Sequence, residues 1–256
     1  MQLSNLLGRA AKLALAVIIL GSALLASAAW YSFGFPHRSN VGSLPALTQE
    51  ERELANVLRR HVDAIASEPH NLDYSQALEG AALYIERILT GYGTPDMGSV
   101  RFANMLAERH EPVSAMLSLE TIGFYSDEPG SQKYPEPFGH ILPSKANFIS
   151  FVAMPGSRNL MHSVMNSFRA STTFPTLGGI APGFIPGMGW SDHWSFVEAG
   201  FQAMMITDTA IFRYPHYHKT NDTPDKVDYD KLARVTKGIE RAIRDLVVAL
   251  PHKGPL

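Results

Sequence analysis

Residues 147–169 read NFISFVAMPGSRNLMHSVMNSFR, and they indicate the fold class most clearly. Its first seven residues are rich in aromatic and β-branched side chains, which predicts a buried strand over 147–153. The residues that follow predict a helix over 158–169. A strand followed closely by a helix is the unit from which α/β domains with a largely parallel sheet are built.

The neighbouring sequence repeats this alternation. Residues 115–121 (AMLSLET) and 203–207 (AMMIT) predict two more strands, and a Pro/Gly-rich loop is expected over 174–189. The last helix follows Val227-Asp228. Its inward stripe is predicted to be Leu232, Val235, Ile239, Ile243 and Leu246.

The first half of the chain does not alternate. Thr48 and Glu51 form a capping box that opens a helix. A second helix is expected over 75–90, between breaks at 69–71 and 91–93, and a third over 99–108. Three consecutive helices without a strand between them do not fit an α/β domain, in which strands separate the helices. We therefore expect the strand–helix alternation to be interrupted near Gly93-Thr94.

The N-terminal segment is strongly apolar. Residues 13–30 form an uncharged stretch of 18 after Arg9 and Lys12, which is about 27 Å of helix, close to the thickness of a bilayer core. We expect a transmembrane signal anchor with residues 1–12 in the cytoplasm and the rest periplasmic or extracellular. The alternative is a secreted protein whose signal is cleaved near Ala26-Ser27-Ala28. Residues 31–47 are expected to be a linker, and 48–256 one domain.

Composition narrows the classes of partner. The net charge of −2 gives no reason to expect nucleic acid as a partner. The chain has no cysteine, so it uses neither disulfides nor thiol chemistry.

Three groups of residues could carry chemistry. Glu120 ends a predicted strand, where ligands of parallel sheets gather, although a salt-bridged carboxylate is the simpler interpretation. Asp192 and His193 lie in GWSDHW (189–194). Asp192 suits the N-cap of a short helix over 194–198 or a group that orients a ligand. The nearby aromatic residues line a pocket or pack in the core: Trp190, Trp194 and Phe196.

The third group is YPHYHKTNDTPD (214–225). His218 could ligate a transition metal, and Tyr217 beside it could donate a hydrogen bond to a developing oxyanion. The simpler alternative is a polar surface loop with His216 and His218 in water.

The order and spacing of the three groups resemble those of the co-catalytic zinc exopeptidases of the bacterial leucyl aminopeptidase and aminopeptidase Y type, peptidase family M28. The resemblance covers residue 49 to the C-terminus and is close through LSLETIG, IPGMGWSDHWSF and TDTAIFRYPHYHKTNDTPDKVDY. It implies a three-layer α/β sandwich, two zinc ions and peptide substrates hydrolysed at the N-terminus. It also implies that Glu120 and His218 each ligate one zinc, that Tyr217 steadies the oxyanion, and that Asp192 and His193 line the site.

The chain departs from that family in one internal segment. The family carries a His-x-Asp motif and a Glu-Glu pair where this chain passes directly from LTGYG (89–93) to TPDMGS (94–99), and its one Glu-Glu pair is Glu50-Glu51. The absent segment would supply the bridging Asp, the general base and the first strands. A catalytic zinc takes three protein ligands, and a general base contributes about 10²–10⁴-fold in rate.

We therefore expect an incomplete peptidase-like domain over 48–256 that binds no stoichiometric zinc and is inactive, without a general base. The alternatives are a non-catalytic binding or scaffolding homologue and a truncated gene product. A glutaminyl-cyclase-like activity is a minor alternative, because those enzymes share the fold.

Overall fold

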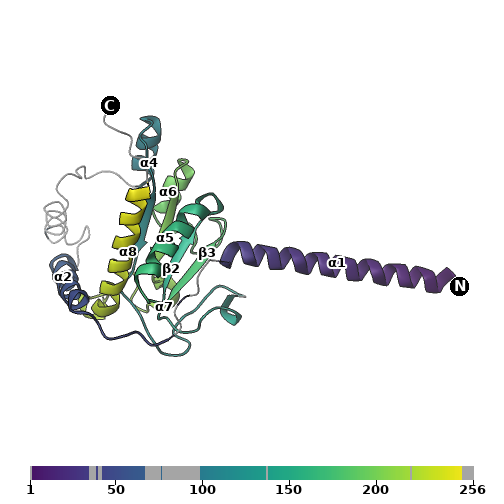
Figure 1. The fold of residues 1–256 in the computed structure, drawn as a ribbon, viewed down its shortest axis with the longest axis horizontal. Coiled ribbons are helices and arrows are strands. Elements are labelled where there is room, and N and C mark those ends of the chain that lie inside the picture. The colour runs from purple at the N-terminus through teal and green to yellow at the C-terminus, as the bar shows by residue number, and fades with distance from the viewer. Residues whose placement is uncertain are drawn as a thin grey trace.

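The computed structural model describes residues 2–34, 39, 42–66, 76, 99–136, 138–219 and 221–249 (Figure 1). Apart from Gln76, the predicted second helix and both of its flanking breaks lie outside these residues. The elements in chain order are α1 Gln2–Phe33, α2 Gln49–Ala66, α4 Ser99–Glu108, β1 Met116–Glu120, η2 Phe138–His140, β2 Ile149–Ala153, η3 Pro155–Ser157, α5 Arg158–Ser171, β3 Thr176–Ile180, α6 His193–Glu198, β4 Ala203–Thr207, α7 Ala210–Arg213, η4 Pro224–Lys226 and α8 Tyr229–Ala249.

The strands form one open sheet in the order β1-β4-β2-β3. β1 pairs with β4 and β2 pairs with β3 in parallel, whereas β2 and β4 are antiparallel. The mostly parallel α/β sheet predicted from the sequence is confirmed. Because β1 and β4 run the same way, Glu120 and Thr207 are register partners and their strands end at one edge.

One face of the sheet is covered by α5 and α8. Side chains of a strand alternate between faces, so Ile149 and Phe151 of β2 point into this layer with Met204 and Ile206 of β4, all fully buried. Phe168 of α5 meets the Phe151 ring edge-on at 5.1 Å between centroids. Truncating such a core Phe to Ala typically costs about 3–5 kcal/mol.

The opposite face is covered only in part. α6 packs on β1 and β4, and α4 packs on α6. Ala103, Phe196 and Ala203 form the buried centre of this second layer. Helices on both faces give the expected three-layer arrangement over β1 and β4, while the same face over β2 and β3 holds a pocket.

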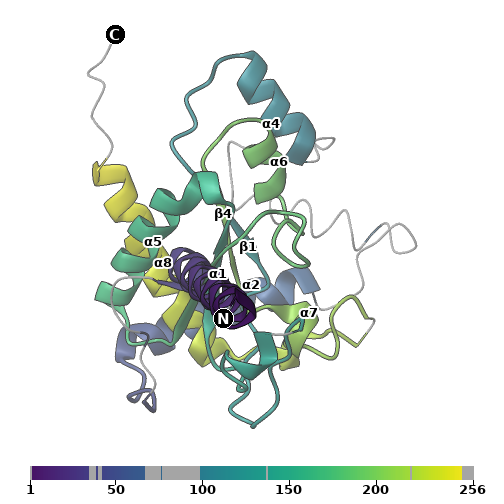
Figure 2. The same ribbon diagram turned by 90° about the vertical axis from the view of Figure 1, so that its right-hand side faces the viewer.

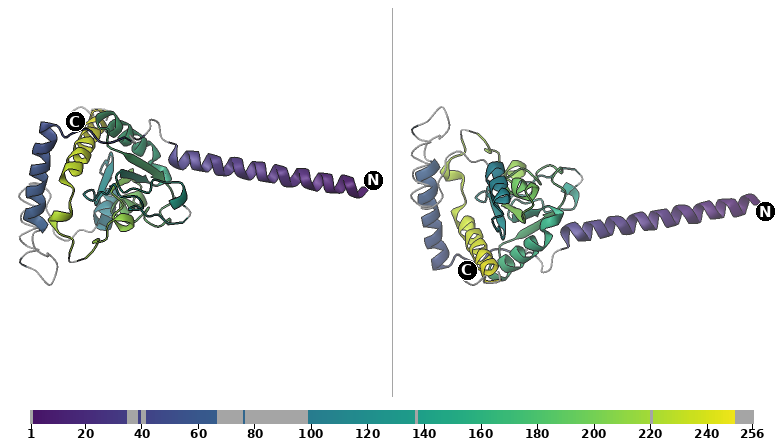
Figure 3. Two further views of the ribbon diagram at one scale, coloured as in Figure 1. Left: turned by 90° about the horizontal axis from the view of Figure 1, so that it is seen from below. Right: turned by 90° about the horizontal axis from the view of Figure 1, so that it is seen from above.

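Helix α2 packs on the outer side of α8, as both views of Figure 3 show. Ala55 of α2 lies against Tyr229, Leu232 and Ala233. The predicted capping box is present, since the Thr48 amide donates to Glu51 at 2.7 Å and the Glu51 amide to Thr48 Oγ1 at 3.2 Å. Such a cap is worth about 1 kcal/mol.

Several expectations at the level of elements were wrong. β3 lies inside the predicted loop 174–189, because backbone pairing with β2 makes a strand of TLGGI despite its two glycines. α7 is a further short helix, and α6 begins at His193, one residue early. Ile243 is 45% exposed instead of facing inward, because Ala242 and Leu246 occupy the core-facing positions in this part of α8.

Helix α1 extends three residues into the expected linker, to Phe33. Its segment Lys12–Phe33 is long and apolar enough to cross a membrane. α1 leaves the domain close to β3, and the view along its axis shows the rest of the fold gathered around that end (Figures 1 and 2).

Candidate functional site

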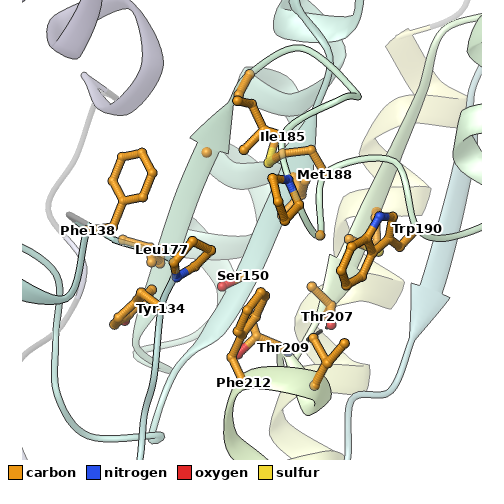
Figure 4. Close-up of a pocket in the computed structure, with 18 of the residues that line it drawn as sticks. Tyr134, Phe138, Ser150, Leu177, Ile185, Met188, Trp190, Thr207, Thr209 and Phe212 are labelled. Atoms are coloured by element: carbon orange, nitrogen blue, oxygen red, sulfur yellow. Dashed lines mark hydrogen bonds between the residues drawn. The ribbon is translucent and has the colours of Figure 1, made fainter.

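A cavity of about 180 Å³ lies on the partly covered face of the sheet (Figure 4). Its floor is formed by the side chains of β2, β3 and β4 that alternate away from α5 and α8, including Ser150, Leu177 and Thr207. Its walls come from the loops around Phe138 and Met188. The lining is largely apolar, with a few polar groups, as in a typical small-molecule site.

Glu120 stands at one end of this cavity, at the carboxyl end of β1. Its Oε2 accepts a hydrogen bond from Ser191 Oγ at 3.0 Å, and Ser191 Oγ lies 2.7 Å from Ser118 Oγ. The two serines therefore fix a half-buried carboxylate beside an apolar space.

Tyr217 lines the same cavity. Its ring stacks on His218, with centroids 3.9 Å apart and an interplanar angle of 17°. Burial, then the negative charges of Glu120 and Asp208, raise the pKa of the Tyr217 phenol. The phenol is thus neutral near pH 7 and can donate a hydrogen bond.

His218 takes a different position. It is exposed, has a φ of 56°, and does not line the cavity that Glu120 and Tyr217 share. The structure therefore brings Glu120 and Tyr217 to one pocket, while the His218 side chain lies at the surface.

Asp192 and His193 lie behind the pocket wall. Asp192 is exposed and occupies the N-cap position of α6, as expected from the sequence, but its side chain makes no capping hydrogen bond. His193 is fully buried and its Nε2 lies 2.8 Å from the carbonyl oxygen of Met188, which lines the cavity. Burial lowers the pKa of His193, so the neutral ring donates from Nε2 and positions the Met188 loop.

Sequence reasoning missed Asp208, which ties the two strand ends beneath the pocket. It is 1% exposed and accepts hydrogen bonds from the Phe124 amide and from Thr121 Oγ1, both at 2.8 Å. Burial raises the pKa of Asp208 even though these donors and Arg213 favour its charged form. The polar run Thr207-Asp208-Thr209 directly after an apolar strand was the pattern that could have revealed it.

The residues beside Asp208 are conformationally strained. Thr121 and Thr209 have φ values of 49° and 63°, in the left-handed region that β-branched residues avoid. Such conformations cost about 1–3 kcal/mol each and concentrate at functional sites. Both threonines line the cavity, so the strain is stored in the pocket itself.

Arg213 supports the pocket from the other side. Its Nε donates to Gln132 Oε1 at 2.8 Å, and its Nη1 donates to the Phe148 carbonyl at 2.9 Å. Burial lowers the pKa of Arg213 to about 10, so the guanidinium remains charged at neutral pH. Gln132 lines the cavity, and Arg213 thereby fixes that wall.

The described side chains at this site do not provide the ligands that a catalytic zinc ion requires. Within the described ranges, no three His, Asp or Glu side chains converge on one point. Glu120 is bonded to Ser191, and His218 lies outside the cavity. A catalytic zinc needs three protein ligands and a water, so the residues that the structure places here do not fit such a centre.

Comparison with known proteins shows which family this chain is related to. The model of the family described as "Peptidase family M28", which is generally zinc-dependent, matches residues 96–243, more than half of the chain. The Escherichia coli protein described as "Uncharacterized protein YfbL" is 36% identical over 149 residues, which cover 58% of this chain and 45% of that protein. This chain thus spans less than half the length of the curated relative it matches.

Two solved structures are similar over part of the fold. An aminopeptidase from Aneurinibacillus sp. strain AM-1 has a TM-score of 0.40 and 23% identity, over 58% of this chain and 30% of that one. The LapA aminopeptidase of Legionella pneumophila has a TM-score of 0.45 and 16% identity, over 67% and 45%. By the extent of the family match, the chain belongs to peptidase family M28.

Proposed function

We propose that this chain is a membrane-anchored member of its family that binds the N-terminal end of peptides without hydrolysing them. The observation that carries the proposal is the pairing of Glu120 with Tyr217 at one end of an apolar pocket. One is a fixed carboxylate and the other a neutral phenol.

This pairing suits a peptide N-terminus. The ammonium group would lie beside the Glu120 carboxylate, and the Tyr217 hydroxyl would donate to the first carbonyl oxygen. The Tyr217 hydroxyl makes no other hydrogen bond within the described part of the chain, which keeps it available for the ligand.

The absence of hydrolysis rests on the sequence. Between LTGYG and TPDMGS the chain has no His-x-Asp motif and no Glu-Glu pair. Glu120 is engaged by Ser191, which suits a binding role. Without a general base, a loss of about 10²–10⁴-fold is expected from that group alone.

The anchor is the apolar segment of α1. Arg9 and Lys12 precede it, and a positive charge on the N-terminal side favours a domain outside the cytoplasm. Retention of the full chain in washed membranes, with protease access from the outside only, is the expected result. A soluble product cut near Ala26-Ser27-Ala28 would point to secretion instead.

Binding and metal content test the proposal on the full chain in detergent micelles. Calorimetry should show a leucyl peptide binding, its N-acetylated form binding much more weakly, and Glu120→Gln weakening the free-amine peptide alone. Mass-spectrometric metal analysis should find no stoichiometric zinc.

Two results would overturn it. Two zinc ions per chain with cleavage of an aminoacyl chromogenic substrate would make the chain an active metallopeptidase. An aggregated protein without a cooperative thermal transition would make it a truncated product.

A further inference from the structure

The apolar end of the cavity lies far from Glu120, beside the end of α1. Phe33, the last residue of α1, lines the cavity and meets the Phe138 ring edge-on at 6.3 Å between centroids. Figure 4 shows Phe138 at one side of the cavity, Trp190 at the other, and Ser150 between them. The pocket thus runs from the pair Glu120–Tyr217 to the membrane helix.

The contacts of α1 place this end at the membrane surface. The Arg158 guanidinium lies 4.2 Å from the centroid of the Tyr31 ring and donates to the Tyr31 carbonyl, which docks the helix end on the domain. Trp30 and Tyr31 are exposed aromatic residues at the end of the apolar segment. Such residues mark the level of the lipid headgroups.

The rim of the cavity is apolar as well. Ile211 of α7 lines the cavity and is 50% exposed, and Ile141 and Phe184, which are 72% and 82% exposed, are the chain neighbours of the lining residues Leu142 and Ile185. Exposed large apolar side chains gathered around one opening mark a surface that meets a membrane or a partner. Because the apolar helix α1 ends beside this opening, we infer that this surface meets the membrane and not a protein partner.

The Ser150 side chain places a buried hydroxyl group inside the cavity. Ser150 is 4% exposed, lines the cavity floor, and its Oγ has no hydrogen-bond partner within the described residues. A buried polar group without a partner costs about 1–3 kcal/mol, so a ligand oxygen that accepts from it is favoured. A purely hydrocarbon ligand would leave it unpaired.

The charge of the residues that line the cavity also limits which ligands can bind there. Glu120 is the one charged residue among the described residues that line the cavity. A ligand carboxylate or phosphate would find no cation there and would meet a negative charge. The part of the ligand that lies in the pocket is therefore not an anion.

From these observations we infer that the cavity holds an acyl chain of a membrane ester lipid, with Ser150 donating to the ester carbonyl oxygen. A cavity of about 180 Å³ admits part of such a chain, since a dry cavity of about 150 Å³ binds benzene. This inference goes beyond the proposed function, because it needs neither peptide binding nor zinc.

The test uses the full chain in phosphatidylcholine nanodiscs that carry a trace of phosphatidylcholine with a diazirine in its acyl chain. After irradiation, mass spectrometry maps the labelled residues. Label is expected on the segments around Phe138, Leu177 and Ile185, in addition to α1.

Gly179 offers a variant that fills the cavity. It lines the pocket, and a Cβ placed on it meets no atom within 4 Å, so Gly179→Phe should fold and remove most of the pocket label. Gly156→Phe is the matched control, because Gly156 has the same free space outside the pocket and should keep the label.

A second variant covers the case in which Gly179→Phe does not fold. Ser150→Ala should reduce the pocket label left by the ester probe roughly 2- to 10-fold relative to the label on α1, the worth of one hydrogen bond, and leave the pocket label from the matching ether-linked probe unchanged.

Three outcomes would overturn the inference. The first is that the label is confined to residues 12–33. The second is that Gly179→Phe and Gly156→Phe carry equal amounts of pocket label. The third is that a water-soluble leucyl peptide displaces the label. The last would make the whole cavity a peptide site. Failure of peptide binding alone would leave the lipid result standing.

Discussion

Thr121 and Asp208, 87 residues apart in the chain, are joined twice: Thr121 Oγ1 lies 2.8 Å from Asp208 Oδ1, and the Asp208 amide donates to the Thr121 carbonyl at 2.7 Å. The pair fastens the end of β1 to the end of β4. Since Glu120 precedes Thr121, the same bonds fix the carboxylate that faces the pocket.

Replacing Asp208 tests this junction. Asp208→Ala leaves the part-buried Phe124 amide without the acceptor that the buried Asp208 provides, so we expect the free energy of unfolding to fall by about 1–3 kcal/mol. Asp208→Asn keeps an acceptor oxygen and should lose less, because burial already disfavours the charged carboxylate. Urea denaturation of both variants measures the difference, and an equal loss in the two would show that the charge itself stabilises the junction.

His193 predicts sensitivity to acid. Burial lowers its folded-state pKa below the unfolded value of about 6.5. As pH falls below about 6.5, the unfolded chain takes up a proton that the folded chain does not, so stability declines with decreasing pH. His193→Gln removes this dependence. Its denaturation midpoint should change less than that of the wild type between pH 7 and pH 5, and parallel changes would locate the acid sensitivity elsewhere.

Tyr217→Phe separates binding from stability. The hydroxyl makes no hydrogen bond within the described residues, so the free energy of unfolding should change by less than about 0.5 kcal/mol. Affinity for a leucyl peptide should fall roughly 2- to 10-fold, the worth of one hydrogen bond. A large loss of stability with unchanged affinity would place the hydroxyl in the fold and not in the site.

Gly238 tests the packing of α5 on α8. A Cβ on Gly238 would lie 2.4 Å from the Phe168 ring. Gly238→Ala should therefore destabilise the protein by about 1–3 kcal/mol, although alanine favours a helix by about 1 kcal/mol over glycine. Gly156→Ala, where the added Cβ meets nothing within 4 Å, is the control. A stabilising Gly238→Ala would contradict the close approach of the two helices.

Local pattern was sufficient for much of the fold. β4 coincides with the predicted strand at 203–207, and the capping box at Thr48 and Glu51 formed as expected. The capping box depends on two residues that are three positions apart, and the strand depends on a run of apolar residues. β3 could not be predicted, because TLGGI becomes a strand only through its ladder with β2.

The residues of the candidate site also differ in whether the sequence alone could reveal them. Glu120 could be placed at a strand end from local pattern, and the structure puts it there. The role of Asp208 depends on two strand ends meeting, and the cavity depends on loops that are distant in sequence. Neither leaves a periodic pattern, so neither could be derived before the topology was known.

We propose that the chain holds a peptide N-terminus without cutting it. Equilibrium dialysis of the full chain in micelles against a leucyl peptide, with zinc chloride present, tests it in one measurement when both compartments are analysed by mass spectrometry. We expect the peptide to accumulate, intact, on the protein side. Free leucine appearing in step with protein concentration would contradict it.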